Sequence, residues 1–238
     1  MAHLLGAEAI HLEYPARVVF ESTTVGVSDG DRIGIVGRNG DGKSSLLGLL
    51  TGQLEPDAGR VTQRSGLRVG ALSQTDTLDS DATVGWSLVG NQADHEWAGD
   101  PRVRDVVNGL VADIAWDAVI GTLSGGQRRR VQLAALLIGD WDVIALDEPT
   151  NHLDIEGITW LAAHLRERRR ALLVVTHDRW FLDAVCERTW EVGDGAVRQF
   201  EGGYAAYVLA RAERSRQADA SEARRQNLLR KELAWLRR

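Results

Sequence analysis

A glycine-rich stretch at residues 37–44 constrains the fold of this chain more than any other feature. Its sequence, GRNGDGKS, fits the pattern G-x-x-x-x-G-K-[ST]. The apolar run Arg32–Val36 before it predicts a short strand, and Ser44–Leu50 after it predicts a helix that ends near Gly52. A loop of this kind between a strand and a helix is typical of an α/β domain. The 238 residues suffice for one large domain of this class, or for a core with a small inserted lobe.

The residue types in this phosphate loop suit the binding of phosphate groups. Its glycines allow backbone N–H groups to point inward around phosphate oxygens, and the following helix adds its positive N-terminal end. Lys43 can bridge the β- and γ-phosphates, and the Ser44 hydroxyl can ligate Mg²⁺. A glycine-rich turn that binds nothing is the alternative, but the flanking strand and helix disfavour it. We expect the nucleotide to be bound by Gly37, Asn39, Gly40, Gly42, Lys43, Ser44 and Ser45.

Two carboxylates follow a second apolar run. Val143–Leu146 predicts a buried parallel strand, and Asp147 and Glu148 come directly after it. Open α/β sheets bind their ligands at the carboxyl ends of such strands. Asp147 could hold Mg²⁺ through water, and Glu148 could polarise an attacking water. Two carboxylates that end a strand at the surface are the alternative, which the phosphate loop upstream disfavours.

The pentapeptide LSGGQ at residues 123–127 predicts a second phosphate cradle. Ser124 is a good N-cap for the helix expected over Gln127–Ile138, and two glycines expose backbone N–H groups at its start. A plain capped helix start would explain the serine but not the whole pentapeptide. Two cradles on one chain suggest that two such domains enclose each nucleotide between them.

These motifs together resemble those of ABC ATPases. The phosphate loop, LSGGQ, the sequence LDEPTNHLD at residues 146–154 and THD at residues 176–178 occur in the order of that family. The resemblance covers about residues 3–200. It implies an α/β fold of the P-loop NTPase class and the ABC ATPase type. This fold has a parallel-sheet core, an antiparallel β subdomain and a small α-helical subdomain. It also implies hydrolysis of ATP, with ATP and Mg²⁺ as cofactors.

The resemblance assigns roles to further residues. Gln74 corresponds to the glutamine that touches Mg²⁺ and the attacking water, although an ordinary surface residue is the alternative. His177 corresponds to the histidine at the γ-phosphate, and Tyr14 to the aromatic residue that stacks on adenine, unless it is ordinary packing. The expected catalytic residues are Lys43, Gln74, Glu148 and His177. The expected Mg²⁺ ligands are Ser44, Gln74 and Asp147, and further nucleotide contacts are expected from Tyr14, Ser124, Gly125, Gly126, Gln127 and Asp154.

Several segments resemble the ABC-F family in particular, whose members are soluble proteins with two ABC domains on one chain. These segments are Asn151-His152 and Phe200–Tyr204, followed by Tyr207 and a charged helix. In that family this helix begins the linker between the two domains, and members act on ribosomes or, in some cases, bind branched nucleic acid. Only 49 residues separate Gln74 from Ser124, so the basic arm that some members insert there is expected to be missing. The phosphate loop also continues with Ser-Ser where Ser-Thr is common.

The uneven charge along the chain suits a nucleic-acid partner. The net charge is −6, but residues 211–238 hold nine basic and four acidic residues, so this tail is +5 and the remainder is −11. A basic tail attracts RNA or DNA, although a solvated charged helix is the alternative. Leu229, Leu233 and Leu236 form an apolar helical stripe, and the chain ends within it. We therefore expect the chain to be part of a longer protein.

Other features place the chain in the cytoplasm, away from membranes. It has no apolar run of the roughly 20 residues that a membrane span needs, and no signal peptide is visible at its start. Its one cysteine, Cys186, excludes an internal disulfide and suits a reducing compartment. We expect a packing role for this residue.

The remaining pattern predicts further elements. Strands are expected at 7–13, 18–27 and 171–176, a helix at 155–169, and a hairpin over 190–200 that turns at 193–195. Residues 69–101, which carry six acidic and no basic residues, are expected to form an acidic surface loop that enters a separate lobe.

We divide the chain into an ABC domain over 1–203, with a helical subdomain at about 84–140, and a basic linker start over 204–238. The expected partners are a second ABC domain, or a second copy of the fragment, and the ribosome or its RNA. Two alternatives are an ATPase subunit of a membrane transporter and an ABC-type ATPase that binds DNA junctions.

Overall fold

The computed structural model describes residues 2–72, 75, 77–92, 94–214, 216–217, 222 and 225. A helical segment over residues 204–214, which we call the C-terminal helix, follows the last strand. The strands are β1 (His3–Tyr14), β2 (Arg17–Ser28), β3 (Arg32–Val36), β4 (Ala58–Gln63), β5 (Val69–Leu72), β6 (Val143–Asp147), β7 (Ala171–Val175), β8 (Arg188–Gly193) and β9 (Ala196–Glu201). The helices are α1 (Lys43–Thr51), α2 (Val84–Val89), α3 (Asp94–Gly99), α4 (Pro101–Leu110), α5 (Gly125–Ile138), α6 (Ile155–Glu167) and α7 (Arg179–Val185), with a 3₁₀ turn η1 (Ile120–Thr122).

A six-stranded sheet in the order β5-β6-β7-β3-β8-β9 forms the centre of the molecule. Its neighbouring strands are parallel except in the predicted β8–β9 hairpin. Successive residues of β7 point to opposite faces: Leu172 and Val174 belong to one hydrophobic core, and Leu173 and Val175 belong to the other. Because both faces are covered, the apolar runs that predicted β3, β6 and β7 are buried almost throughout.

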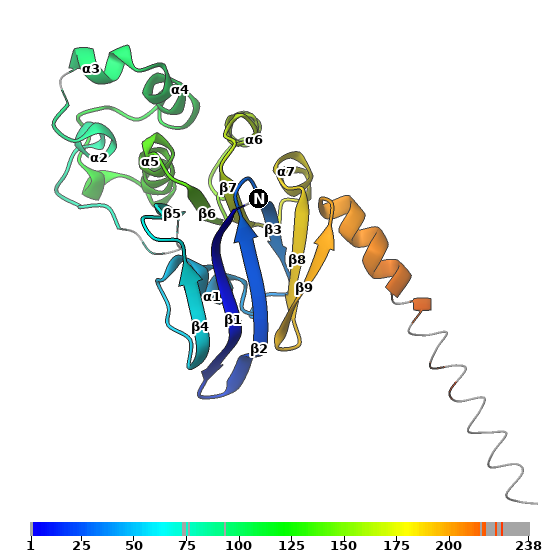
Figure 1. The fold of residues 1–238 in the computed structure, drawn as a ribbon. Helices are drawn as coiled ribbons and strands as arrows, with labels where there is room; N and C mark the ends of the chain where they lie inside the picture. The colour runs from blue at the N-terminus through cyan, green and yellow to red at the C-terminus, as the bar shows by residue number, and fades with distance from the viewer. Residues whose placement is uncertain are drawn as a thin grey trace, which may run out of the picture.

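An antiparallel sheet in the order β2-β1-β4 packs over helix α1 (Figure 1). The predicted strands at 7–13 and 18–27 are confirmed, and both are longer than expected. Apolar residues of β1 and β2 share one core with Leu46, Leu49 and Leu50 of α1. This core fixes the helix that starts at the phosphate loop, between the two sheets.

Helices α2, α3 and α4 form a lobe on one side of the sheet, together with α5 (Figure 1). The expectation of an acidic surface loop over 69–101 is wrong for most of this stretch. Val69–Leu72 is a strand paired in parallel with β6, and two helices follow it. The acidic composition hid the four-residue strand. In the lobe that the sequence predicted beyond it, Trp97 and Trp116 stack with ring centroids 4.3 Å apart.

The C-terminal helix leaves the opposite side of the sheet, beside β9 (Figure 1). Tyr207 packs edge-on against Phe200 of β9, with ring centroids 5.1 Å apart. Cys186 is buried, and burial raises the pKa of its thiol to about 12, which supports the predicted packing role. The predicted stripe of Leu229, Leu233 and Leu236 lies outside the described residues. Among the described residues, no helix is long and apolar enough to cross a membrane. The division at residue 203 stays a prediction.

Candidate nucleotide site

The phosphate loop joins β3 to α1, as predicted, and curls around its own lysine. Gly42 caps α1 with φ of 102°, and a Cβ there would lie 2.3 Å from Val19, so a larger residue does not fit. Lys43 is 8% exposed, and its ammonium group donates to the carbonyl oxygens of Gly37 and Arg38 at 3.1 and 3.0 Å. An ammonium group has three N–H donors, so one remains for a phosphate oxygen after these two bonds.

The carboxylates lie where β6 ends, beside the end of β7. Asp147 is 3% exposed. Glu148 has φ of 50°, an uncommon left-handed conformation for a residue with a side chain, and its backbone N–H donates to Val175 at 2.7 Å. Its carboxylate oxygen lies 3.4 Å from Nε2 of His177. The strand order therefore brings together the expected base and the expected histidine, which are 29 positions apart in the chain.

A cavity of about 320 Å³ collects most of the expected phosphate-binding residues. Gly37 lines a neighbouring cavity that also reaches Lys43 and His177. The smaller cavity is lined by Asn39, Gly40, Gly42, Lys43, Ser44, Ser45, Asp147, Glu148, Val175 and His177.

Two residues in this cavity suit Mg²⁺. The Oδ1 atom of Asp147 is buried and makes no hydrogen bond within the described part of the chain. A buried carboxylate oxygen without a partner is costly, and a cation would satisfy it. The hydroxyl-bearing Ser44 lines the same cavity. Carboxylate and hydroxyl oxygens are the ligand types that Mg²⁺ prefers, so the residues fit the metal.

Tyr14 lies outside that cavity, at the tip of the β1–β2 hairpin, and is 48% exposed. It pairs across the hairpin with Arg17, whose guanidinium donates to the carbonyl of Gly40 at 2.8 Å and to Asp41 at 3.3 Å. Arg17 was not singled out from the sequence, because no motif contains it. It ties the hairpin that carries the expected adenine contact to the phosphate loop.

The LSGGQ segment starts helix α5 with a reciprocal cap. The Ser124 hydroxyl accepts from the backbone of Gln127 at 3.2 Å, and the Gln127 side chain accepts from the backbone of Ser124 at 3.0 Å. Ser124, Gly126 and Gln127 line a different cavity of about 870 Å³, together with Asp154, which caps α6. Gly125 lines a third cavity, which also includes Glu148.

The structure thus does not bring the LSGGQ segment into the cavity of the phosphate loop. Gln74 lies outside the described residues. The expected roles of all the site residues, those that line the phosphate-loop cavity as well as Tyr14, Gln74, Asp154 and the LSGGQ residues, stay predictions.

Sequence reasoning missed a polar bridge beneath the site. Arg129 of α5 donates to the carbonyl oxygen of Asp147 at 2.6 Å and to the Gln132 side chain at 3.1 Å. Gln132 is 8% exposed and donates to the carbonyl of Thr75 at 3.0 Å and to the hydroxyl of Thr77 at 3.1 Å. The signal was present as two polar residues three positions apart on an otherwise apolar helix face.

Comparison with known proteins agrees with this geometry. The family model described as "ABC transporter" matches residues 20–151, more than half of the chain. A solved structure, described as the ATP binding subunit of an ABC transporter, superposes with a TM-score of 0.71 at 20% identity. It covers 83% of this chain, which covers 90% of that one. This likeness confirms the predicted fold class.

Two curated relatives align over nearly the whole chain. The uncharacterized ABC transporter ATP-binding protein YfmR of Bacillus subtilis is 36% identical over 99% of this chain. The energy-dependent translational throttle protein EttA of Mycobacterium tuberculosis is 34% identical over 93% of it. The chain spans less than half the length of either relative, 43% and 46% respectively.

The matched family model, the fold and the phosphate-loop geometry agree with one another. This chain therefore belongs to the ABC transporter family as one of its ATP-binding domains, a family that hydrolyses ATP.

Proposed function

We propose that this chain is the first ABC domain of an ABC-F protein that hydrolyses ATP and acts on ribosomes during translation. The single observation that best supports hydrolysis is the 3.4 Å approach of Glu148 to His177 in a cavity shared with Lys43. The segments that resemble ABC-F proteins, and the similarity to a protein named as a translational throttle, support the ribosomal role.

In the proposed reaction, water attacks the γ-phosphate in line with the bond that breaks. Glu148 orients this water and accepts its proton. Lys43 and His177 stabilise the negative charge on the transferred group. Mg²⁺, when bound through Ser44 and Asp147, supplies further neutralisation of phosphate charge, and we propose Gln74 as a third ligand. Tyr14 stacks on the adenine.

The LSGGQ segment serves a nucleotide held by another domain. This is supported by its place in a cavity separate from that of the phosphate loop. We propose that a second ABC domain supplies the missing segment, either from the same full-length protein or as a second copy of this fragment. The isolated chain should then bind ATP but hydrolyse it slowly.

The chain is proposed to lack the basic arm of some ABC-F proteins. The alignment with YfmR runs over 272 positions, which exceeds the 238 residues of this chain, so the relative contains residues that this chain does not. Contact with RNA would then depend on other basic residues, which include those of the tail over 211–238. A cytoplasmic location follows from a ribosomal role.

Co-sedimentation with purified ribosomes tests the proposal. The 238-residue chain should sediment with ribosomes in ATP and be released in ADP. A Glu148→Gln variant, which keeps ATP bound, should stay with ribosomes for longer. Recovery with a membrane fraction instead would favour a transporter subunit, and selective binding of branched DNA would favour a junction ATPase. Either result would overturn the ribosomal role.

A further inference from the structure

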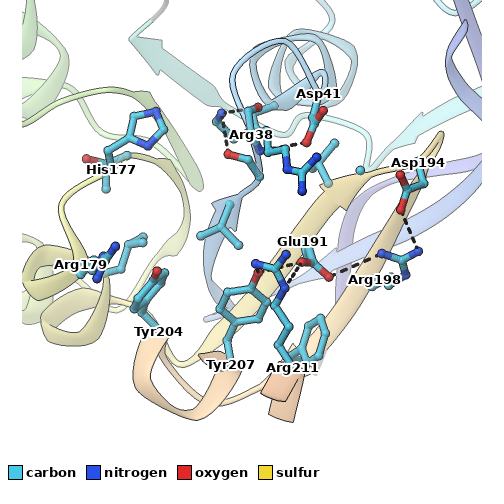
Figure 2. Close-up of a pocket in the computed structure, with 18 of the residues that line it drawn as sticks. Arg38, Asp41, His177, Arg179, Glu191, Asp194, Arg198, Tyr204, Tyr207 and Arg211 are labelled. Atoms are coloured by element: carbon cyan, nitrogen blue, oxygen red, sulfur yellow. Dashed lines mark hydrogen bonds and ion pairs between the residues drawn. The ribbon is translucent and has the colours of Figure 1, made fainter. Parts of the chain in front are cut away.

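A second, larger cavity lies next to the phosphate loop, where the C-terminal helix leaves β9. Its volume is about 750 Å³. Figure 2 shows that its labelled side chains come from four places: Arg38 and Asp41 of the phosphate loop, His177 and Arg179 at the start of α7, Glu191 to Arg198 of the β8–β9 hairpin, and Tyr204 to Arg211 of the C-terminal helix. The expected nucleotide contacts reach only one edge of it, at Gly37, Lys43 and His177.

This cavity carries an excess of positive charge on an acidic protein. Six of its lining residues are lysine or arginine, and three are aspartate or glutamate. The part of the chain before residue 211 has a net charge of −11. The charge of this cavity is therefore opposite in sign to the net charge of the domain that carries it.

The carboxylates of the cavity are already paired. Glu191 accepts from the Tyr207 hydroxyl at 2.7 Å and lies 3.3 Å from Arg211 and 3.6 Å from Arg198. Asp194 also lies 3.3 Å from Arg198. These contacts neutralise two of the arginines and fasten the C-terminal helix to β8.

Three other arginines have no carboxylate partner among the residues that the structure describes. They are Arg38, Arg179 and Arg214. The guanidinium of Arg214 lies 4.6 Å from the centre of the Phe200 ring, and that of Arg179 lies 5.6 Å from the centre of the Tyr204 ring. Stacking on an aromatic ring restrains an arginine while its N–H groups stay available for a ligand.

We propose that this cavity binds the phosphodiester backbone of RNA. Arginines that donate to phosphate oxygens, placed among aromatic rings, are the usual means of binding flexible nucleic acid. The volume exceeds what one phosphate group needs, which suits a short stretch of backbone. The choice of RNA over DNA rests on the proposed ribosomal function. The site would contact RNA at the base of the proposed linker.

Binding of a fluorescent single-stranded RNA to the 238-residue chain tests this site, measured by anisotropy over a range of salt. The pocket variant is Arg179→Gln with Arg214→Gln. The control is Arg166→Gln with Arg169→Gln, two exposed arginines at the end of α6 that remove the same charge elsewhere. The pocket variant should bind at least about tenfold more weakly. Its slope of log affinity against log salt should fall by about 1.4, because roughly 0.7 is lost for each phosphate contact on a single strand. The control should change less than twofold.

Equal losses in both variants, or no loss in either, would overturn the proposal, because the tail alone would then explain RNA binding. Tighter binding of DNA of the same sequence would overturn the choice of RNA. Unchanged RNA binding with weakened ATP-dependent pairing to a second ABC domain would reassign the cavity to that domain.

Thermal melting of both variants checks that they fold. If the pocket variant loses affinity for RNA and the parent chain does not bind ribosomes, the RNA site is supported and the proposed ribosomal function is wrong. Ribosome binding that both variants keep, with RNA affinity unchanged, refutes the site alone.

Discussion

The phosphate loop and the LSGGQ segment share one feature that suits phosphate binding, but the side chains around them differ. Both present backbone N–H groups at the start of a helix. The phosphate loop is accompanied by a buried lysine at the start of α1, and by two carboxylates and a histidine at the ends of two neighbouring strands. The LSGGQ segment shares its cavity with α4, α6 and the caps of two helices. The first region gathers most of the groups that the proposed reaction needs, and the second has the backbone geometry alone, in line with the proposal that it serves a nucleotide held by another domain.

The difference follows from where each region is anchored. Residues at the ends of β3, β6 and β7 are held by hydrogen bonds between strands and by cores on both faces. The LSGGQ segment is held by α5, whose packing partners include the smaller helical lobe. Arg129 of α5 donates to the carbonyl of Asp147 and to the side chain of Gln132, and is therefore a direct polar connection between the two regions.

The largest effect is expected at Glu148, in the cavity of the phosphate loop. Glu148→Gln should lower the turnover of ATP by about 10²–10⁴-fold, since it removes the proposed base. The affinity for ATP should stay within a few-fold, because Lys43 and the phosphate loop are unchanged. Phosphate release and nucleotide binding should both be measured. The control is Glu167→Gln, a change at the exposed end of α6 outside both this cavity and that of the LSGGQ segment. Unchanged turnover with normal binding would show that the assigned role is wrong.

A smaller effect is expected at the bridge between the regions. Gln132→Leu removes the hydrogen bonds to Thr75 and Thr77 and one from Arg129. The free energy of unfolding should fall by about 1–3 kcal/mol, measured by urea denaturation. Gln63→Leu is the matched control, since its side chain donates a hydrogen bond to the carbonyl of Leu50 at 3.1 Å. An equal loss in the control would mean that the bridge is worth no more than a single surface contact.

A change at Ser124, which caps the first turn of α5, tests the role proposed for the LSGGQ segment. Ser124→Ala should cost about 1 kcal/mol of stability, as loss of an N-cap usually does. ATP affinity of the isolated chain should not change, since we propose that the segment serves a nucleotide held by another domain. Thr83→Ala removes a comparable cap from α2, where the hydroxyl accepts from Trp86 at 3.2 Å. Only Ser124→Ala should weaken ATP-dependent pairing with a second ABC domain. A loss of ATP affinity in the isolated chain would contradict the comparison between the two regions.

Local sequence patterns predicted the strand and helix on either side of the phosphate loop better than the rest of the fold. Arg32–Val36 forms a strand with the predicted bounds, and α1 begins one residue before the predicted start, because apolar runs and glycines act over a few residues. Neither the strand Val69–Leu72 nor the approach of Glu148 to His177 could be derived in this way. Both depend on the order of strands in the sheet, which pairs segments far apart in the chain. The role of His177 at the γ-phosphate was predicted from the family resemblance and not from hydrophobic periodicity.

The smallest effect is expected where the helical lobe meets the sheet side, at His164 of α6. Its Nδ1 lies 2.8 Å from Asp105 of α4. Burial lowers the pKa of His164 from its usual 6.5, and Arg168 acts in the same direction, although Asp105 opposes them. Between the lowered pKa and 6.5, the unfolded chain binds a proton that the folded chain does not. The free energy of unfolding should therefore fall as the pH drops through this window, by at most about 1.4 kcal/mol per pH unit.

Urea denaturation at pH 7.5 and 5.5 measures this term. The difference between the two pH values should be smaller in His164→Gln than in the parent chain, since glutamine does not titrate. His95→Gln, a change at an exposed histidine of α3, should leave the difference as it is. If the difference is unchanged in His164→Gln, the contact with Asp105 balances burial, and if it is larger in the variant, the contact outweighs burial. In that last case, protonation of His164 would strengthen its ion pair with Asp105 and so stabilise the contact between the helical lobe and α6.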